Sequence, residues 1–376
     1  MVVCARLAGR IPATIAGLLL ATVGASPFIE SFTFSGELLA SLVAVLSLIA
    51  FLLYLRHDAW PWLVACGLLT GCAVMIKQSG FDAGLAAVAF LLLTRRSRGL
   101  IPAAVIVATA AVPVLVGFLS ASDQGNWWYA MVTYRGQGDS ILSGSTGGRW
   151  HQFRESVVPV LKADAPLFLL AAYGWRTSPL LARLWVAAAA LGVLGGGNFH
   201  NHYYIQLGPP LAILAGWGAA RAIERRSGLV AGVAVGLALW AAYFTVPLWF
   251  DSPVAQARAV FPGDGHLQHD GPVIDYVRSH TRPGQRIFVM WAAANVYYLS
   301  DRRPAVRYLW YRNIQAIPGA LAGVRKVLAG PDPPALIVGE QPAGELDRSG
   351  ATGKLLARRY QRVATVSGIP IYRLRR

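Results

Sequence analysis

The chain has 376 residues, of which 55% are hydrophobic and only 14% are charged, and its formal net charge is +16. Soluble domains carry about 25% charged residues, so this composition excludes an ordinary soluble protein. The positive charge favours an anionic partner. In the first two thirds of the chain, however, the positive charge sits in short clusters between apolar runs, which is a signal of membrane topology and argues against nucleic acid as that partner.

Charge is unevenly distributed along the chain. Residues 1–250 hold sixteen Lys and Arg and nine Asp and Glu, whereas the shorter stretch 251–376 holds eighteen and nine. Such a shift in composition marks a domain boundary. We therefore expect a helical transmembrane domain over 1–250 and a soluble α/β domain over 251–376.

Apolar runs in the first domain predict about nine transmembrane helices. A bilayer core of about 30 Å requires roughly 17–25 mostly apolar residues per helix. The runs at 81–94 and 165–175 are shorter than this range. The predicted spans are 11–25, 37–55, 61–77, 81–94, 99–119, 165–175, 183–198, 203–221 and 229–249.

Basic residues between the runs predict the orientation. With a cytoplasmic N-terminus, eleven Lys and Arg fall on the inner side and five on the outer side, as the positive-inside rule requires. Nine crossings then place the C-terminal domain outside the cytoplasm. A signal peptide is an alternative for the first run, because Arg6 and Arg10 precede a short apolar stretch that ends in small residues. That alternative leaves the remaining threading unchanged.

Two polar groups lie at the predicted outer ends of the early helices. Glu30 and Glu37 flank a turn and are suited to act as a general base or to orient a sugar; a solvated turn is the alternative. Lys77 ends the third span. Its cation is suited to a lipid phosphate, and a lysine that only reaches toward the interface is the alternative.

The long outer loop, residues 120–165, is rich in aromatic and basic side chains. Trp and Tyr settle at membrane interfaces, so one interpretation is an aromatic anchor that lies on the surface or re-enters the membrane. The other is a loop that covers the substrate, with Arg149 as a phosphate contact.

A glycine run followed by a His and Tyr cluster occupies residues 195–210. His200 and His202 alternate and are chemically suited to a metal, but no acid or cysteine lies near them in the sequence. Hydrogen bonds from His202 and Tyr203 to a phosphate or a sugar are the favoured interpretation. We expect no metal site and no cofactor, with a divalent cation left open.

These residues carry a resemblance to a known family. The segment Gly-Gly-Gly-Asn-Phe-His-Asn-His-Tyr-Tyr-Ile-Gln-Leu-Gly-Pro-Pro-Leu-Ala (195–212) resembles a late-helix signature of GT-C glycosyltransferases, closest to the bacterial protein-mannosyltransferase and aminoarabinose-transferase-like enzymes. A second pattern of the family, a glutamate followed by Gly-x-x-x-Gly and then a lysine, is similar to Glu37, Gly67 to Gly71 and Lys77 in this chain. The stretches 283–289 and 297–308 look like the outer domain of many bacterial members.

The resemblance implies a reaction and a location. The donor would be a polyprenyl-phosphate sugar, the acceptor a protein or a cell-envelope glycan, and the site the outer face of a bacterial plasma membrane. Such a transfer requires a carboxylate that takes the acceptor's proton and groups that hold the departing phosphate. The sequence offers four candidates for the second role: Lys77, Arg149, His202 and Tyr203.

One part of the family pattern has no counterpart in the sequence. Family members carry an acidic pair in the first large outer loop, whereas this chain resembles the family only from its third helix. We expect either a start assigned too far downstream or an inactive copy. Glu30 and Glu37 are the remaining candidate acids, at positions that do not match the family's.

The last third reads as alternating helices and strands. Predicted strands are 286–291, 306–310, 335–338, 363–366 and 369–372, and predicted helices are 273–279, 293–299 and 315–328. Asp264, His266, His269 and Asp270 are interpreted as a polar linker. The net positive charge of this domain suits anionic headgroups or an anionic acceptor polymer. A flippase for lipid-linked substrates and a non-catalytic membrane subunit are the alternative functions.

Overall fold

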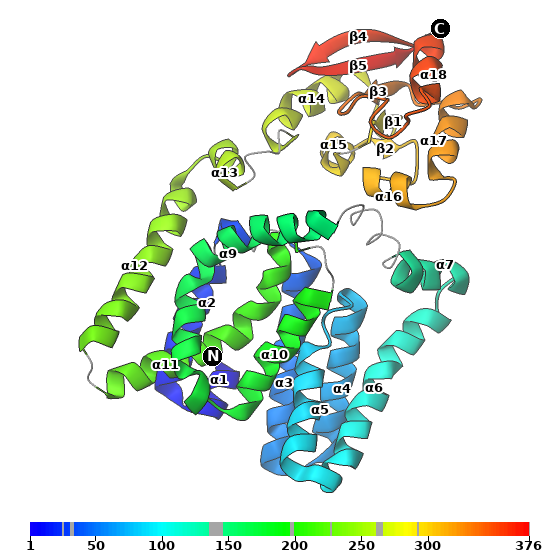
Figure 1. The fold of residues 1–376 in the computed structure, drawn as a ribbon. Coiled ribbons are helices and arrows are strands. Elements are labelled where there is room, and N and C mark those ends of the chain that lie inside the picture. Colours follow the sequence, from blue (N-terminus) through cyan, green and yellow to red (C-terminus); the bar gives the residue numbers. More distant parts are fainter. Residues whose placement is uncertain are drawn as a thin grey trace. The chain divides into compact units, whose positions relative to one another are not determined.

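The computed structural model describes residues 1–24, 26–30, 34–134, 146–195, 199–225, 228–260, 266–291 and 293–375. The chain divides into two compact units, each with its own hydrophobic core (Figure 1). Unit 1 comprises residues 1–131 and 142–251, and unit 2 comprises residues 132–141 and 252–376.

Unit 1 is built from helices. Its longer elements are α2 (Arg10–Gly24), α3 (Gly36–His57), α4 (Trp60–Ile76), α5 (Asp82–Arg95), α6 (Leu100–Leu119), α9 (Thr146–Gly174), α10 (Leu180–Gly195), α11 (Gly208–Glu224) and α12 (Gly228–Phe250). Shorter ones are α1 (Val2–Ala8), η1 (Pro27–Ile29), η2 (Arg96–Gly99), α7 (Gln124–Trp128), η3 (Tyr129–Thr133), η4 (Trp175–Thr177) and η5 (Asn201–Leu207).

Two stretches of the described chain are long and apolar enough to cross a membrane, judged by length and composition. They are Gly36–His57 and Asp82–Leu119. The helices Phe153–Lys162 and Asp164–Thr177 are bent by 83° at a break between them. If this pair is one span, the described chain has a third candidate span. The protein is thus mainly helical and carries membrane-type helices. The nine crossings expected from the sequence remain a prediction.

Small residues bring α4 and α6 into close contact. A Cβ atom added at Gly67 of α4 would meet Thr109 of α6, and one added at Gly117 of α6 would meet Met75 of α4. The later residue of α4, Met75, contacts the later residue of α6, Gly117. The two helices therefore run in the same direction. The chain between them, α5, must therefore run back. A positive φ of 50° at Arg96 helps to make the turn from α5 into α6.

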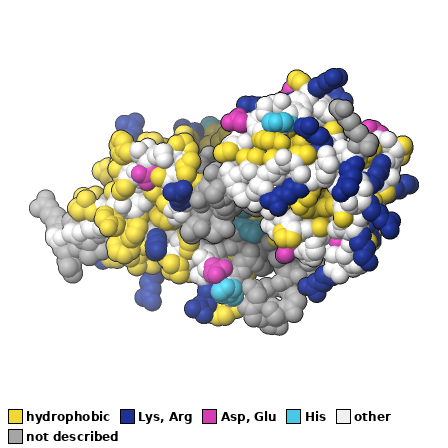
Figure 2. Space-filling view, turned by 90° about the horizontal axis from the view of Figure 1, so that it is seen from above, with side chains coloured by type: hydrophobic (Ala, Val, Ile, Leu, Met, Phe, Trp, Pro, Cys, Tyr) yellow, Lys and Arg dark blue, Asp and Glu magenta, His cyan; other side chains and the backbone are white. Residues whose placement is uncertain are grey.

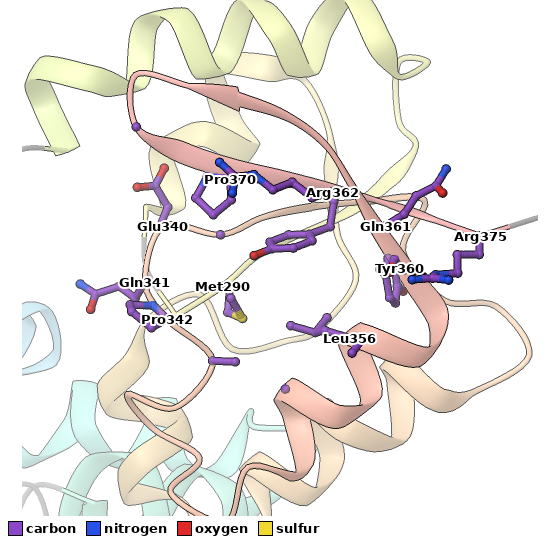
Figure 3. A pocket seen from close by; sticks show the side chains of 16 residues that line it. Met290, Glu340, Gln341, Pro342, Leu356, Tyr360, Gln361, Arg362, Pro370 and Arg375 are labelled. Atoms are coloured by element: carbon purple, nitrogen blue, oxygen red, sulfur yellow. Dashed lines mark hydrogen bonds between the residues drawn. The ribbon is translucent and has the colours of Figure 1, made fainter.

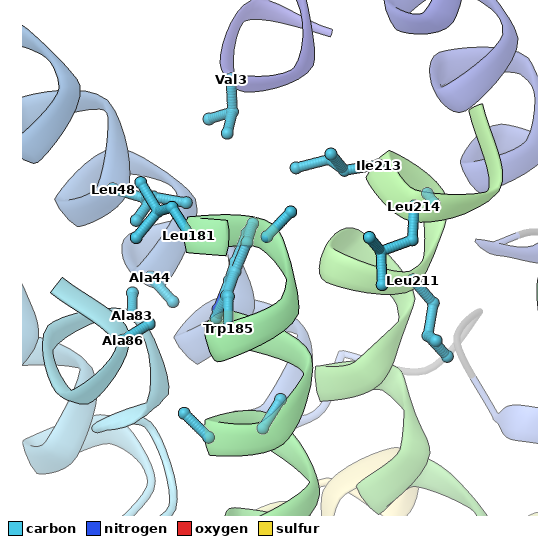
Figure 4. Close-up of a cluster of buried hydrophobic side chains, with 14 of the residues drawn as sticks. Val3, Ala44, Leu48, Ala83, Ala86, Leu181, Trp185, Leu211, Ile213 and Leu214 are labelled. Carbon is cyan, nitrogen blue, oxygen red and sulfur yellow. The ribbon is translucent and has the colours of Figure 1, made fainter. Parts of the chain in front are cut away.

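The core of unit 1 lies where α3, α5, α10 and α11 meet. Figure 4 shows large side chains of these helices directed toward one another, together with the small residues that let the helices approach. The indole of Trp185 is 1% exposed. The labelled members of this core are Val3, Ala44, Leu48, Ala83, Ala86, Leu181, Trp185, Leu211, Ile213 and Leu214.

Unit 2 contains a five-stranded mixed sheet with the strand order β2-β1-β3-β5-β4. The first three strands pair in parallel and the last three antiparallel, with Ile287 opposite Leu336 and Val338 opposite Ile371. The strands are β1 (Arg286–Val289), β2 (Arg303–Pro304), β3 (Leu336–Val338), β4 (Tyr360–Val366) and β5 (Ile369–Leu374).

Helices cover both faces of this sheet. Side chains alternate between the faces along a strand: Ile287 and Val289 pack with α14 and α15, whereas Phe288 packs with α16, α17 and α18. Two buried faces explain why β1 and β3 are continuously apolar. The helices of unit 2 are α13 (Pro253–Val260), α14 (His266–His280), α15 (Ala294–Ser300), α16 (Tyr311–Ala316), α17 (Ala320–Ala329) and α18 (Ala351–Arg359).

Three expectations for unit 2 are wrong in detail. Residues 306–310 form no strand: Val306 is buried in the core, but the edge strand is the two-residue β2 just before it. The single helix predicted over 315–328 is two helices, α16 and α17, and α18 was not predicted at all. The supposed polar linker enters helix α14, where Asp270 is 3% exposed and accepts a hydrogen bond from Asn295; Asp264 lies outside the described residues.

A single buried acid joins α17 to the loop before α18. Asp347 is 2% exposed and accepts hydrogen bonds from the Thr352 backbone N–H (2.7 Å), the Thr352 hydroxyl (2.6 Å) and the Arg325 guanidinium (3.1 Å). Burial by itself raises the pKa of a carboxyl. Here the hydrogen bonds from Ser349, Thr352 and Arg325 outweigh that effect and hold the pKa of Asp347 well below its usual range.

Candidate functional site

Glu37 and Lys77 form a buried ion pair between two helix ends of unit 1. Ser35 caps α3 by accepting from the Leu38 backbone N–H at 3.3 Å, and this places Glu37 in the first helical turn. Lys77 ends α4 in an extended conformation. Its Nζ contacts Glu37 Oε1, with exposed fractions of 20% for the Lys77 side chain and 4% for that of Glu37.

His202 links that ion pair to a second carboxylate. Its Nδ1 lies 2.7 Å from Glu30 Oε2, and its Nε2 lies 3.7 Å from Glu37 Oε1. The imidazole comes from η5, and Glu30 directly follows η1 in the left-handed conformation, at φ 55°. The side chains of Glu30 and His202 are 20% and 28% exposed, so they are partly open to a ligand.

Two aromatic rings complete this group. Lys77 Nζ lies 3.9 Å from the centre of the Tyr203 ring, within the range of a cation–π contact. The His200 and His202 rings stack with centres 5.5 Å apart, and Tyr203 meets His202 edge-on at 5.0 Å. We call Glu30, Glu37, Lys77, His202 and Tyr203 the acid–base cluster.

The charges of the acid–base cluster do not cancel in every protonation state. Two carboxylates face one lysine, so the group carries a net negative charge when the imidazole is neutral. It becomes neutral when the imidazole takes up a proton. A cluster of this composition can therefore accept one proton without leaving uncompensated positive charge in a site that is largely screened from water.

Neighbouring hydrogen bonds hold η5 in place. Gln206 is 5% exposed and donates to the Ser79 carbonyl, two residues beyond Lys77. Tyr204 is held by Ser156 of α9, with 3.1 Å between the hydroxyl oxygens. These residues turn one side of η5 into the core and leave His202 and Tyr203 on the side of the carboxylates. They are positioning residues that the sequence patterns did not single out.

Asp82 and Trp185 connect the helices beneath the cluster. The Trp185 indole N–H donates to Asp82 Oδ2 at 2.8 Å, and both side chains are 1% exposed. The two residues are 103 positions apart. An acid at the start of an apolar helix is common, so nothing in the sequence indicated this partner.

The predicted site residues divide into two sets. The structure brings Lys77, His202 and Tyr203 together with both candidate acids, Glu30 and Glu37. Arg149 lies in α9, but its side chain is outside the described residues. Within the described ranges, no three His, Cys, Asp or Glu side chains are arranged to hold a metal ion.

Several residues that carried the family resemblance have packing roles. Gly67 and Gly71 lie against α6. In unit 2, the hydroxyl of Tyr297 accepts from the Val289 backbone N–H at 2.6 Å, and the Arg302 guanidinium donates to the carbonyls of Ser300, Asp301, Arg278 and Thr281. These residues shape the two units and touch no polar site.

Neither a protein-family model, nor a curated protein, nor a solved structure matches this chain. The resemblance to GT-C glycosyltransferases therefore rests on the residues quoted above, and function has to be argued from the acid–base cluster itself.

Proposed function

We propose that this protein is a membrane glycosyltransferase of the GT-C type. It takes a sugar from a polyprenyl-phosphate donor and passes it to a protein or cell-envelope glycan on the extracytoplasmic face of a bacterial plasma membrane. In this proposal nine helices of unit 1 cross the membrane and unit 2 lies outside the cytoplasm. The observation that carries it is the acid–base cluster, which gathers a general base and a cation from three separate parts of the chain.

The surface of unit 1 supports a membrane location. Soluble monomers rarely expose contiguous apolar patches of more than a few hundred Å², yet helices of unit 1 leave many large apolar side chains more than half exposed. In a bilayer such side chains face lipid. They include Leu18, Leu42, Leu93, Val107, Leu119 and Leu191.

His202 is suited to remove the acceptor's proton. An ionised Glu30 can only accept hydrogen bonds, so the short contact with His202 requires the hydrogen on Nδ1 and leaves the lone pair on Nε2. Nε2 is then the base. As the acceptor oxygen bonds to the anomeric carbon, its proton passes to Nε2. The Glu37 carboxylate, 3.7 Å away, stabilises the resulting imidazolium.

Lys77 is suited to stabilise the departing phosphate. The bond between the anomeric carbon and the phosphate oxygen breaks, and its electron pair stays with the phosphate, which gains negative charge. A lysine cation at that oxygen stabilises the transition state. Glu37 and the Tyr203 ring keep the ammonium group at one place in the absence of substrate.

One observation favours a second candidate, a flippase of lipid-linked substrates. Residues 153–177 form a helix pair bent by 83°, and Asp164, at the start of its second half, is 3% exposed. Among the described residues its Oδ1 has no hydrogen-bond partner. Broken helices and buried ionisable groups are typical of transport pathways.

Reconstitution of the purified full chain in liposomes tests the proposal. The donor is a polyprenyl phosphate that carries labelled mannose, and the measurement is loss of the lipid-linked label to an acceptor peptide, an envelope glycan or water. His202→Ala is expected to slow transfer by about 100-fold or more, because a general base contributes roughly 10²–10⁴-fold. Glu30→Gln is expected to slow it less, because the base itself remains.

His151→Ala is the matched control. His151 also pairs with a glutamate, Glu155, at 3.0 Å, but both side chains are exposed. Its replacement is expected to leave the rate unchanged. Equal rates for the His202 and His151 variants would contradict the assignment of the base. Movement of the label across the bilayer without transfer would instead establish the flippase.

A further inference from the structure

Unit 2 contains a cavity of about 650 Å³ that plays no part in the proposed transfer chemistry. Figure 3 shows it between helix α18 and the β4–β5 hairpin, with Met290 and Leu356 at its centre. Met290 directly follows β1, and the segment from Gly339 to Ala343 directly follows β3. The cavity therefore opens at the carboxyl ends of two neighbouring parallel strands.

The strand order indicates that this position is a ligand site. From β1 the chain passes through α15 to β2 on one side of β1, whereas from β3, on the other side of β1, it passes through α18 to β4 in the opposite direction. The connections thus leave in opposite directions from the carboxyl ends of β1 and β3. In open α/β sheets a crevice at such a reversal is the usual ligand site, and the volume falls in the usual range of about 300–1,000 Å³.

We propose that this cavity binds a saccharide that carries a carboxylate or a phosphate group. The anion is recognised by Arg375, and the sugar ring lies over the apolar floor near Tyr372. Binding here is independent of any transfer chemistry in unit 1.

The charges at the cavity favour an anion. No ion pair joins Arg375 to a carboxylate within the residues that the structure describes. Arg375 Nε donates to the Tyr360 carbonyl at 3.1 Å. The guanidinium is therefore oriented and keeps N–H groups for a ligand. Figure 2 shows many Lys and Arg side chains on the face of the protein that is seen from above.

The remaining walls suit a sugar. Met290 and Leu356 provide an apolar floor, and Tyr372 adds an aromatic ring. In Figure 3 the side chain of Arg362 extends toward Pro370, away from Arg375, and Glu340 and Gln341 also lie on the side of the cavity opposite to Arg375. The carboxylate of Glu340 and the amide of Gln341 are suited to hydroxyl groups at a distance from the anion. A ligand with one anionic end and several hydroxyls matches this distribution.

The N-terminus of α18 argues against a nucleotide. Sheets of this kind bind nucleotide phosphates at a helix N-terminus. Here the carboxylate of Asp347 accepts the Thr352 backbone N–H at 2.7 Å and the Thr352 hydroxyl at 2.6 Å. A phosphate at this helix end would meet a negative charge, so the anion must be bound by Arg375.

Ligand-observed saturation-transfer NMR on the purified full chain in detergent micelles tests the proposal. The probes are glucuronic acid, glucose 6-phosphate, glucose and inorganic phosphate, each titrated separately. The two anionic sugars are expected to bind about tenfold more tightly than glucose and than phosphate alone, because a hydrogen bond to a charged group adds an order of magnitude in affinity. A difference between the two sugars identifies the preferred anion.

Variants separate this site from general charge. Arg375→Gln is expected to weaken the binding of the anionic sugars by about tenfold and to leave glucose unchanged. Arg375→Lys keeps the charge and is expected to retain most of the preference for the anionic sugars, so it stays informative when Arg375→Gln fails to fold. Arg373→Gln is the control, because Arg373 lies beside Tyr372 on β5 but does not line the cavity. Absence of binding, equal binding of glucose, or equal losses in Arg375→Gln and Arg373→Gln would overturn the proposal.

Discussion

The two units treat buried charge differently. In unit 2, Asp347 is surrounded by donors from its own loop and by Arg325 of α17, which is the one distant donor among the described residues. In unit 1, Glu37 meets Lys77, 40 positions away, and His202, from a third segment. The Asp347 network is closed and fixes the fold. The acid–base cluster is partly open, since Lys77 and His202 keep 20% and 28% exposure. Buried charge that a ligand can reach is the better indicator of function.

Removal of the closed network is expected to have the largest effect. Asp347→Ala leaves the Arg325 guanidinium and the Thr352 hydroxyl without their acceptor, and loss of one partner of a buried pair costs about 3–5 kcal/mol. Hydrogen exchange in the β1 and β3 peptides measures the free energy of unfolding of unit 2 and should show this loss. Asp332→Ala, which removes an exposed partner of Arg286, is expected to cost at most about 1 kcal/mol. Equal losses would contradict the distinction.

Removal of a charge from the open cluster is expected to have a smaller effect. Lys77→Met leaves Glu37 buried beside a partly exposed gap, so we expect a loss of about 2–3 kcal/mol, measured as thermal unfolding of the full chain in detergent. Glu37→Gln in the same chain should restore most of it, because the uncompensated charge is gone. Lys162→Met replaces an exposed lysine and should be neutral. A double variant no more stable than Lys77→Met would show that Glu37 does not depend on Lys77.

The sequence predicted local features of both units better than their long-range partners. Apolar runs located most of the long helices of unit 1 within a few residues, because length and composition determine them. The prediction of a loop over 120–165 and a span over 165–175 was wrong, because helix α9 already begins at Thr146. The sequence predicts a helix over 203–221, but residues 203–207 belong to the 3₁₀ helix η5, which also carries His202. Segments around Glu30, Lys77 and His202 each looked polar at one predicted membrane face. Their convergence on Glu37 depends on packing between distant helices, which no local pattern encodes.

The contact of Gly71 with α6 tests whether the packing of α4 against α6 supports the acid–base cluster. Gly71→Ala places a Cβ atom against the Ala110 carbonyl and Pro113 of α6, and overpacking of this kind costs about 1–3 kcal/mol. The shift would also move Lys77 at the end of α4. Gly232→Ala in α12 is the control, because nothing lies within 4 Å of the added atom. Thermal unfolding of both variants checks the prediction, and equal midpoints would mean that α4 and α6 are not held by this contact.

The smallest effect is the response of unit 2 to acid. The pKa of Asp347 is depressed in the folded state, so unfolded chains bind a proton more readily than folded ones. The stability that this carboxylate provides is therefore complete above its unfolded pKa of about 3.9 and falls as the pH drops toward the folded pKa. Between pH 6 and pH 3 we expect a loss of about 1 kcal/mol from this group. Hydrogen exchange of unit 2 at both pH values measures the total loss, and Asp347→Asn should reduce it by that amount. An unchanged acid response in the variant would show that Asp347 titrates alike in both states and that its network contributes little to folding.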